Sequence, residues 1–124
     1  MIIHIEPESE LPIYAQLTNQ IIEGIAGGLL RPGDSLPSVR AFAADLGVNM
    51  HTVNKSYHEL ERKGIIQIVP KSGAVIRFPQ AVSHGDTEYE RLKSDLKPMV
   101  AEALVLGMDE KAVAKMIDEI IRSF

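Results

Sequence analysis

Apolar positions recur with a helical period through the first part of the chain. Between Leu11 and Gly27 they stand three or four residues apart, which predicts a first helix that the glycine ends. A second helix is predicted between Ser38 and Gly47, because a serine hydroxyl can accept a bond from a free backbone N–H group and glycine readily closes a helix. The proline and glycine that lie between these two segments predict a turn.

A third helix is predicted to follow almost at once. Asn49 is a good N-cap, and Gly64 is expected to close the helix about four turns later. Two short segments rich in Ile and Val then follow, at residues 65–69 and 74–78, with a turn between them that predicts a β-hairpin. Three helices and a hairpin in this order predict a winged helix-turn-helix at residues 1–78, in an α+β chain that is mainly α.

The C-terminal part of the sequence has a different pattern. Residues 79–85 read as a linker, and residues 86–124 carry two helical stripes that are too wide to be buried by two helices alone. An apolar surface of that width predicts a two-fold contact with a second copy, so this part is expected to be a dimerisation element. The apolar positions expected in the dimer are Leu92, Leu96, Met99, Val100, Ala103, Val113, Met116, Ile117, Ile120, Ile121 and Phe124.

Composition places the chain in an ordinary globular class, with 45% hydrophobic and 24% charged residues. The absence of cysteine excludes disulfides, thiolate metal sites and cysteine nucleophiles, and it suits a reducing compartment. No apolar run approaches the ~20 residues that span a bilayer, and residues 1–30 hold no Lys or Arg. We therefore expect a cytoplasmic protein with no membrane span.

The net charge of −4 is unevenly distributed along the chain. Residues 31–78 hold seven Lys and Arg against four Asp and Glu, whereas the segments on both sides are acidic. Binding responds to the local field and not to the total charge, so this basic middle is compatible with a nucleic-acid partner. A chance fluctuation in a short window would look the same.

Polar and cationic residues share one face of the predicted third helix. His51, Asn54, Lys55, His58 and Arg62 follow helical spacing, opposite to an apolar stripe. A helix in the major groove needs such a face, because Asn can pair with adenine and Lys can reach guanine or a phosphate. An ordinary solvated face is the alternative, and the close succession of the second and third helices favours DNA.

Two further positions favour contacts with the DNA backbone. Arg40 is expected near the start of the second helix, where helix-turn-helix proteins cross the phosphates. The alternative is a surface arginine paired with Asp34 or Asp45. Lys71 and Gly73 lie at the predicted hairpin tip, where glycine allows close approach and lysine supplies charge, although a plain exposed turn fits as well.

Enzyme and metal functions find little support in the sequence. Residues 33–36 spell Gly-Asp-Ser-Leu, a serine esterase signature, but no Asp-x-x-His follows and the chain leaves no room for the usual α/β sheet. His51 and His58 are too far apart to chelate a metal from one helix. We expect neither an enzyme nor a metal or other cofactor.

The stretch LPSVRAFAADLGVNMHTVNKSYHELERKGIIQIVPKSGAVIRF, residues 36–78, resembles the GntR family of bacterial regulators. Residues 12–14 and 30–34 also look like the first helix and turn of that family, and the short tail is similar to its YtrA-like branch. Met50 stands where many members have Arg, and Phe42 where most have Leu. The resemblance implies that the residues facing DNA are Ser38, Arg40, Asn49, Met50, His51, Thr52, Asn54, Lys71, Ser72 and Gly73.

These observations predict a transcription regulator that binds a palindromic operator as a homodimer, with repression by occlusion as the expected mechanism. The alternative is a winged-helix adaptor that holds a protein partner and reads no DNA, which the net acidity favours. A pocket of ~300–1,000 Å³ is hard to fit into two helices. A small-molecule effector would therefore bind across the dimer or between the tail and the winged domain.

Overall fold

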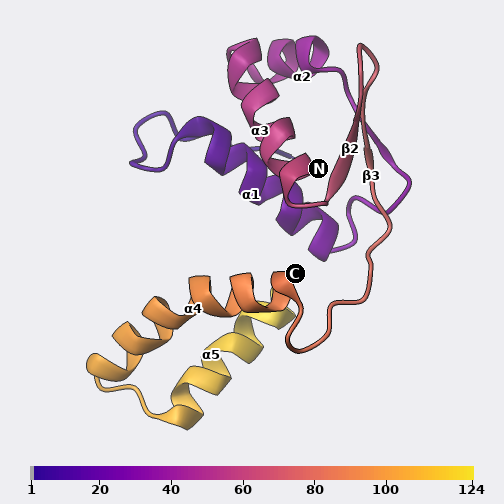
Figure 1. The fold of residues 1–124 in the computed structure, drawn as a ribbon. Helices are drawn as coiled ribbons and strands as arrows, with labels where there is room; N and C mark the ends of the chain where they lie inside the picture. The colour runs from indigo at the N-terminus through magenta and orange to yellow at the C-terminus, as the bar shows by residue number, and fades with distance from the viewer. Residues whose placement is uncertain (1) are drawn as a thin grey trace. The chain divides into compact units, whose positions relative to one another are not determined.

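The computed structural model describes residues 2–124, which form two compact units that divide after Pro79. The first unit contains three helices and a small sheet, and the second contains two helices (Figure 1). The elements are α1 (Ile13–Ala26), β1 (Ser35–Leu36), α2 (Val39–Leu46), α3 (Met50–Arg62), β2 (Ile66–Val69), β3 (Gly73–Ile76), α4 (Thr87–Val105) and α5 (Glu110–Arg122).

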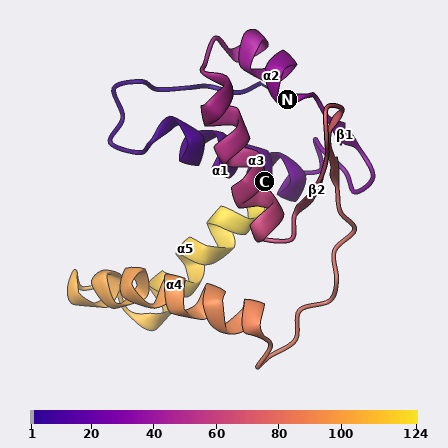
Figure 2. The same ribbon diagram turned by 45° about the horizontal axis from the view of Figure 1, so that its top comes forward.

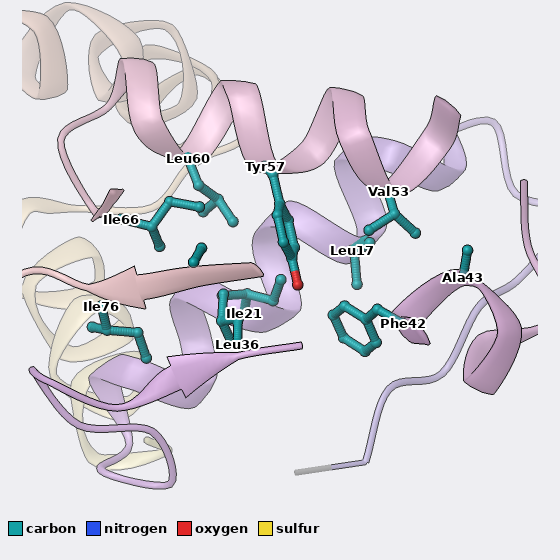
Figure 3. Packing of buried hydrophobic residues seen from close by; sticks show 11 residues of the cluster. Leu17, Ile21, Leu36, Phe42, Ala43, Val53, Tyr57, Leu60, Ile66 and Ile76 are labelled. Carbon is teal, nitrogen blue, oxygen red and sulfur yellow. The ribbon is translucent and has the colours of Figure 1, made fainter. Parts of the chain in front are cut away.

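The core of the first unit lies where α3 packs on α1 and α2. Val53, Tyr57 and Leu60 of α3 are fully buried, and Leu17 and Ile21 of α1 are buried with them. Figure 3 shows these side chains pointing from the two helices into one cluster, which Phe42 of α2 and residues of the sheet complete. The apolar stripe predicted for α3 is therefore its buried face, which leaves the opposite face exposed.

The helix ends confirm the capping predictions. The Ser38 hydroxyl accepts a bond from the backbone N–H of Ala41, and Gly47 closes α2 in the left-handed conformation. The Asn49 side chain accepts a bond of 2.7 Å from the backbone N–H of His51. Satisfying these otherwise unpaired N–H groups fixes the first residue of each helix, and so fixes the faces that α2 and α3 present.

The sheet has one strand more than the sequence predicted. β3 lies between β1 and β2, and both pairings are antiparallel (Figure 2). The predicted hairpin is present but shorter, because residues 65, 77 and 78 lie outside the strands. β1 has only two residues, and so few positions cannot display the alternation that identifies a strand. The Gly-Asp-Ser-Leu tetrapeptide is thus the end of a turn and this short strand.

The second unit is a pair of helices joined at Leu106–Asp109. α4 continues through Pro98, and the Asp109 side chain caps α5 by accepting a bond from the backbone N–H of Ala112. The two helices pack against each other. Ala103 and Val113 are buried, whereas most other apolar side chains of the unit are exposed.

Candidate nucleic-acid interface

The exposed face of α3 carries the polar residues that the sequence analysis assigned to it. His51, Asn54, Lys55 and His58 are all exposed, and Thr52 is half-buried. The buried face of the same helix consists of apolar side chains and the fully buried Ser56. A short helix with a firmly packed inner face and a polar outer face can present side chains to a base edge without losing its support.

A pair of buried hydroxyl groups sets the position of α3 on α1. Ser56 Oγ and Thr18 Oγ1 lie 2.8 Å apart, and Thr18 also donates to the backbone oxygen of Tyr14. A buried hydroxyl needs a hydrogen-bond partner, so sliding α3 along α1 would take Ser56 away from the Thr18 hydroxyl at a cost in free energy. The sequence analysis missed this pair, which only the packing of the two helices brings together.

Lys55 differs from its neighbours on the exposed face. Its Nζ lies 4.1 Å from the centre of the Tyr14 ring, so the side chain extends towards α1 in a cation–π contact. Tyr14 lies in the apolar series between Leu11 and Gly27 from which the first helix was predicted, and it is half-buried. In this position the Lys55 charge lies beside α1. Asn54, in contrast, makes no side-chain hydrogen bond within residues 2–124.

The start of α2 presents Ser38 and Arg40. Ser38 is half-buried because its hydroxyl caps the helix, and Arg40 is exposed. The pairing with Asp34 or Asp45 that the sequence left open is not formed within residues 2–124, since Asp34 instead accepts a bond from the backbone N–H of Arg31. Arg40 is therefore available to an anionic partner.

The hairpin tip consists of Pro70, Lys71 and Ser72. Lys71 is exposed and has a φ of 67°, a left-handed conformation that costs a non-glycine residue about 1–2 kcal/mol. The Ser72 backbone N–H closes the turn on the Val69 oxygen at 3.0 Å. Strain that is kept at an exposed cation is typical of a functional position.

Gly73 has a place that the sequence analysis did not expect. The residue is buried, and a Cβ added to it would lie 2.2 Å from the backbone oxygen of Leu36 and 2.8 Å from that of Pro37. Its missing side chain is therefore required by the approach of β1 within the domain. The sequence analysis expected Gly73 to allow the close approach of DNA, whereas the chain that approaches it in the structure is this protein's own β1.

These parts lie at one end of the first unit. The hairpin tip projects towards the end that holds α2 and the start of α3, in both views (Figure 1 and Figure 2). Arg40 near the start of α2, the residues from Asn49 onwards, and Lys71 thus belong to elements that converge. A surface that combines a polar helix face with two flanking cations fits a groove lined by phosphates.

Tyr57 and Glu61 of α3 make contacts that the sequence analysis did not anticipate. The Tyr57 hydroxyl donates a bond of 2.7 Å to the backbone oxygen of Pro37, and Glu61 Oε2 accepts one of 2.8 Å from the backbone N–H of Ile68. Burial raises the pKa of the Tyr57 hydroxyl, so the group remains a donor at neutral pH. The amphipathic pattern identified Tyr57 only as a core residue.

The second unit exposes a large apolar surface. The most exposed of the residues predicted to form a dimer are Met99 at 71% and Ile121 at 63%. Ala103 and Val113 are already buried in the single chain, and Val100 is half-buried, so these three contribute less to any outer face. The exposed members of the predicted set are Leu92, Leu96, Met99, Met116, Ile117, Ile120, Ile121 and Phe124.

Two further features of residues 2–124 concern metal binding and membrane insertion. No group of three His, Asp or Glu side chains in this range could hold a metal ion. None of the helices in this range is both long and apolar enough to cross a bilayer.

Comparison with known proteins gives consistent matches over the whole chain. Residues 5–76 match the family described as "Bacterial regulatory proteins, gntR family". The HTH-type transcriptional repressor YtrA of Bacillus subtilis is 36% identical over 95% of this chain and 91% of its own length. The uncharacterized HTH-type transcriptional regulator YhcF of the same organism is 34% identical over 87% of this chain and 84% of its own length.

Solved structures agree with these matches. YtrA from Sulfolobus acidocaldarius, described as a GntR-family transcription factor, has a TM-score of 0.60 with 38% identity, and covers 98% of this chain and 97% of its own. A protein described as a transcriptional antiterminator from Listeria monocytogenes has a TM-score of 0.84 with 32% identity over 97% of this chain and 90% of its own. The DNA-binding domain of AraR, solved with operator ORX1, has a TM-score of 0.51 with 30% identity over 59% of this chain and 96% of its own.

Proposed function

The chain belongs to the gntR family of bacterial regulatory proteins, and from this premise we propose that it is a cytoplasmic repressor that binds a palindromic operator as a homodimer. Its relatives are transcription regulators and not enzymes. The observation that carries the proposal is the exposed polar face of α3, backed by a fully buried apolar face. The face enters the major groove, where base edges present distinct donors and acceptors.

Each converging element has its own task in this proposal. Asn54 reads a base edge, and the start of α3, where the positive end of the helix dipole lies, receives a phosphate oxygen. Arg40 and Lys71 neutralise phosphates on the two sides of the groove and so set the orientation of the protein. The full set proposed at the DNA is Ser38, Arg40, Asn49, Met50, His51, Thr52, Asn54, Lys55, Lys71, Ser72 and Gly73. Gly73 contributes to DNA binding through the shape of the wing. Lys55 contributes through its positive charge beside α1.

The second unit supplies the dimer. Its exposed apolar side chains would be costly in water and gain about 25 cal/mol for each Å² that a second copy covers. Two-fold symmetry makes the same face serve both copies. With one α3 in each of two successive major grooves, the half-sites lie about 10 bp apart or a multiple of that distance.

The repressor role is supported by the match to the Bacillus subtilis protein, whose name describes it as a transcriptional repressor. A dimer that covers a palindrome within a promoter excludes polymerase from the same DNA. Repression by occlusion therefore requires no contact with polymerase and no catalytic group.

Selection of bound fragments from random duplexes tests the proposal. We expect an inverted repeat to be enriched, and the enriched duplex to bind at least about 10³-fold more tightly than a scrambled one at physiological salt. Enrichment without an inverted repeat would contradict the dimer. Equal binding to both duplexes would contradict sequence reading and favour an adaptor that holds a protein partner.

A further inference from the structure

The hairpin of β2 and β3, which we call the wing, is connected to α3 by one direct and one indirect bond. In each, an α3 side chain binds a backbone group: one in β2, and one in the residue that follows β1, the strand paired with β3. Tyr57 donates to the Pro37 oxygen, which directly follows β1, and Glu61 accepts from the Ile68 N–H of β2. The two side chains stand one helical turn apart, so together they oppose rotation of the wing about either one.

The bond from Glu61 uses the free edge of the sheet. β2 pairs only with β3, and the Arg77 N–H donates to the Ile65 oxygen, so in this register the Ile68 N–H points away from β3. An unpaired N–H on an edge strand normally bonds to water. Here the Glu61 carboxylate replaces the water molecule as the acceptor. A charged acceptor makes a stronger hydrogen bond than a neutral one.

The bond from Tyr57 reaches a crowded joint. Pro37 lies between β1 and the Ser38 cap of α2, and its backbone oxygen and carbon are 2.8 Å from the position that a Gly73 Cβ would take. The phenol is fully buried but Pro37 is exposed, so the bond is partly shielded from competing water. Figure 3 shows the Tyr57 ring pointing from α3 into the middle of the cluster beside Leu36. Any shift of the wing at Gly73 therefore disturbs the same carbonyl that Tyr57 holds.

We propose that Tyr57 and Glu61 are positioning residues that lock the wing to α3, so that the Lys71 contact with a phosphate depends on their two bonds. The inference rests on the proposed DNA binding. It adds that the bonds made by Tyr57 and Glu61 hold the wing at a fixed position relative to α3. Neither residue needs to touch DNA. Glu61 in particular is an anion, and phosphates would repel it if it served as a direct contact.

The test measures how operator affinity depends on salt, because the slope counts the phosphate contacts made by bound protein. The variants are Glu61→Ala and Glu61→Gln, each with and without Lys71→Ala, on the duplex enriched from random sequences. Both substitutions at Glu61 remove the same charge, but glutamine keeps an oxygen that can accept from the Ile68 N–H. Tyr57→Phe, which keeps the ring in the core, is measured in the same way.

In the wild-type background we expect Lys71→Ala to lower the slope by about one phosphate contact. With Glu61→Gln the same drop is expected. With Glu61→Ala or Tyr57→Phe the slope is already reduced, and Lys71→Ala is expected to lower it no further. A loss of stability alone would reduce the folded fraction without changing the slope, so this readout separates positioning from folding.

Two outcomes would overturn the inference. One is an equal drop on Lys71→Ala in all four backgrounds, which would mean that the wing keeps its place without the two bonds. The other is a wild-type slope that Lys71→Ala leaves unchanged. The proposed function is judged separately, by whether the wild-type protein prefers the enriched duplex over a scrambled one.

Discussion

Asn54 is the residue to which the proposed function assigns the reading of a base. It is exposed on the outer face of α3, and its amide offers both a donor and an acceptor. Those two groups match the edge of adenine in the major groove.

Replacing Asn54 with alanine should therefore weaken specific binding more than general binding. We expect a cost of about 1–3 kcal/mol on the enriched duplex and little change on a scrambled one. Fluorescence anisotropy titrations of both duplexes measure the two values. Equal losses on the two duplexes would show that Asn54 contributes to the binding of any DNA sequence and does not read a base.

Tyr14 and Lys55 should be energetically coupled, since the Lys55 Nζ lies 4.1 Å from the Tyr14 ring centre. A cation–π contact at an exposed site contributes about 0.5–1 kcal/mol. We expect a double-mutant cycle of Tyr14→Leu and Lys55→Met to give a coupling of that size in urea unfolding, and Tyr14→Phe to retain it. A coupling near zero would mean that the lysine does not rest on the ring in solution.

At the scale of the elements, the hydrophobic period and the caps predicted all five helices. Ser38, Gly47 and Asn49 mark helix ends through local hydrogen bonds, which act between neighbours in the sequence and can therefore be recognised from it. The exposed face of α3 followed from the same period. Such features need no knowledge of what packs against them.

Contacts between distant segments could not be predicted in this way. β1 has two residues and exists only because β3 lies beside it. The sequence assigned no contact to Glu61, because its partner, the Ile68 N–H, becomes a neighbour only when the chain folds back. Gly73 was recognised as a site of close approach, but its partner at Leu36 lies 37 residues earlier in the chain.

Gly73→Ala gives a test of the joint between the wing and β1. The added methyl would lie 2.2 Å from the Leu36 oxygen, so β1 and β3 must separate. Gly64→Ala is the matched control, because Gly64 also has a positive φ but nothing within 4 Å of the added carbon. We expect the control to lose about 1–2 kcal/mol of unfolding free energy and Gly73→Ala to lose clearly more. Equal losses of unfolding free energy in the two variants would mean that the packing between β1 and β3 can accommodate the added methyl.

For the molecule as a whole, the proposed dimer would raise DNA affinity by joining two winged units. Linking two units raises the effective concentration of the second unit at its half-site. The proposal assigns this linkage to the second unit, where Ile117 and Ile120 are exposed on α5. If DNA reading and assembly are divided in this way, a substitution in one unit changes one property alone.

Ile120→Glu should therefore yield a folded monomer that binds the operator weakly. A buried unpaired carboxylate in each copy opposes association, whereas the monomer leaves this position half exposed and tolerates it. Light scattering coupled to gel filtration measures the mass. Lys115→Ser on the same helix is the control and should remain dimeric. An Ile120→Glu protein of unchanged mass would contradict the assignment of this face to the dimer.

The most direct test of base reading by α3 is to repeat the selection from random duplexes with Asn54→Arg. Arginine pairs with guanine where asparagine pairs with adenine. We predict that the enriched inverted repeat keeps its half-site spacing but exchanges adenine for guanine at one position in each half-site. An enriched sequence identical to that of the wild-type protein would contradict the claim that the outer face of α3 reads the operator.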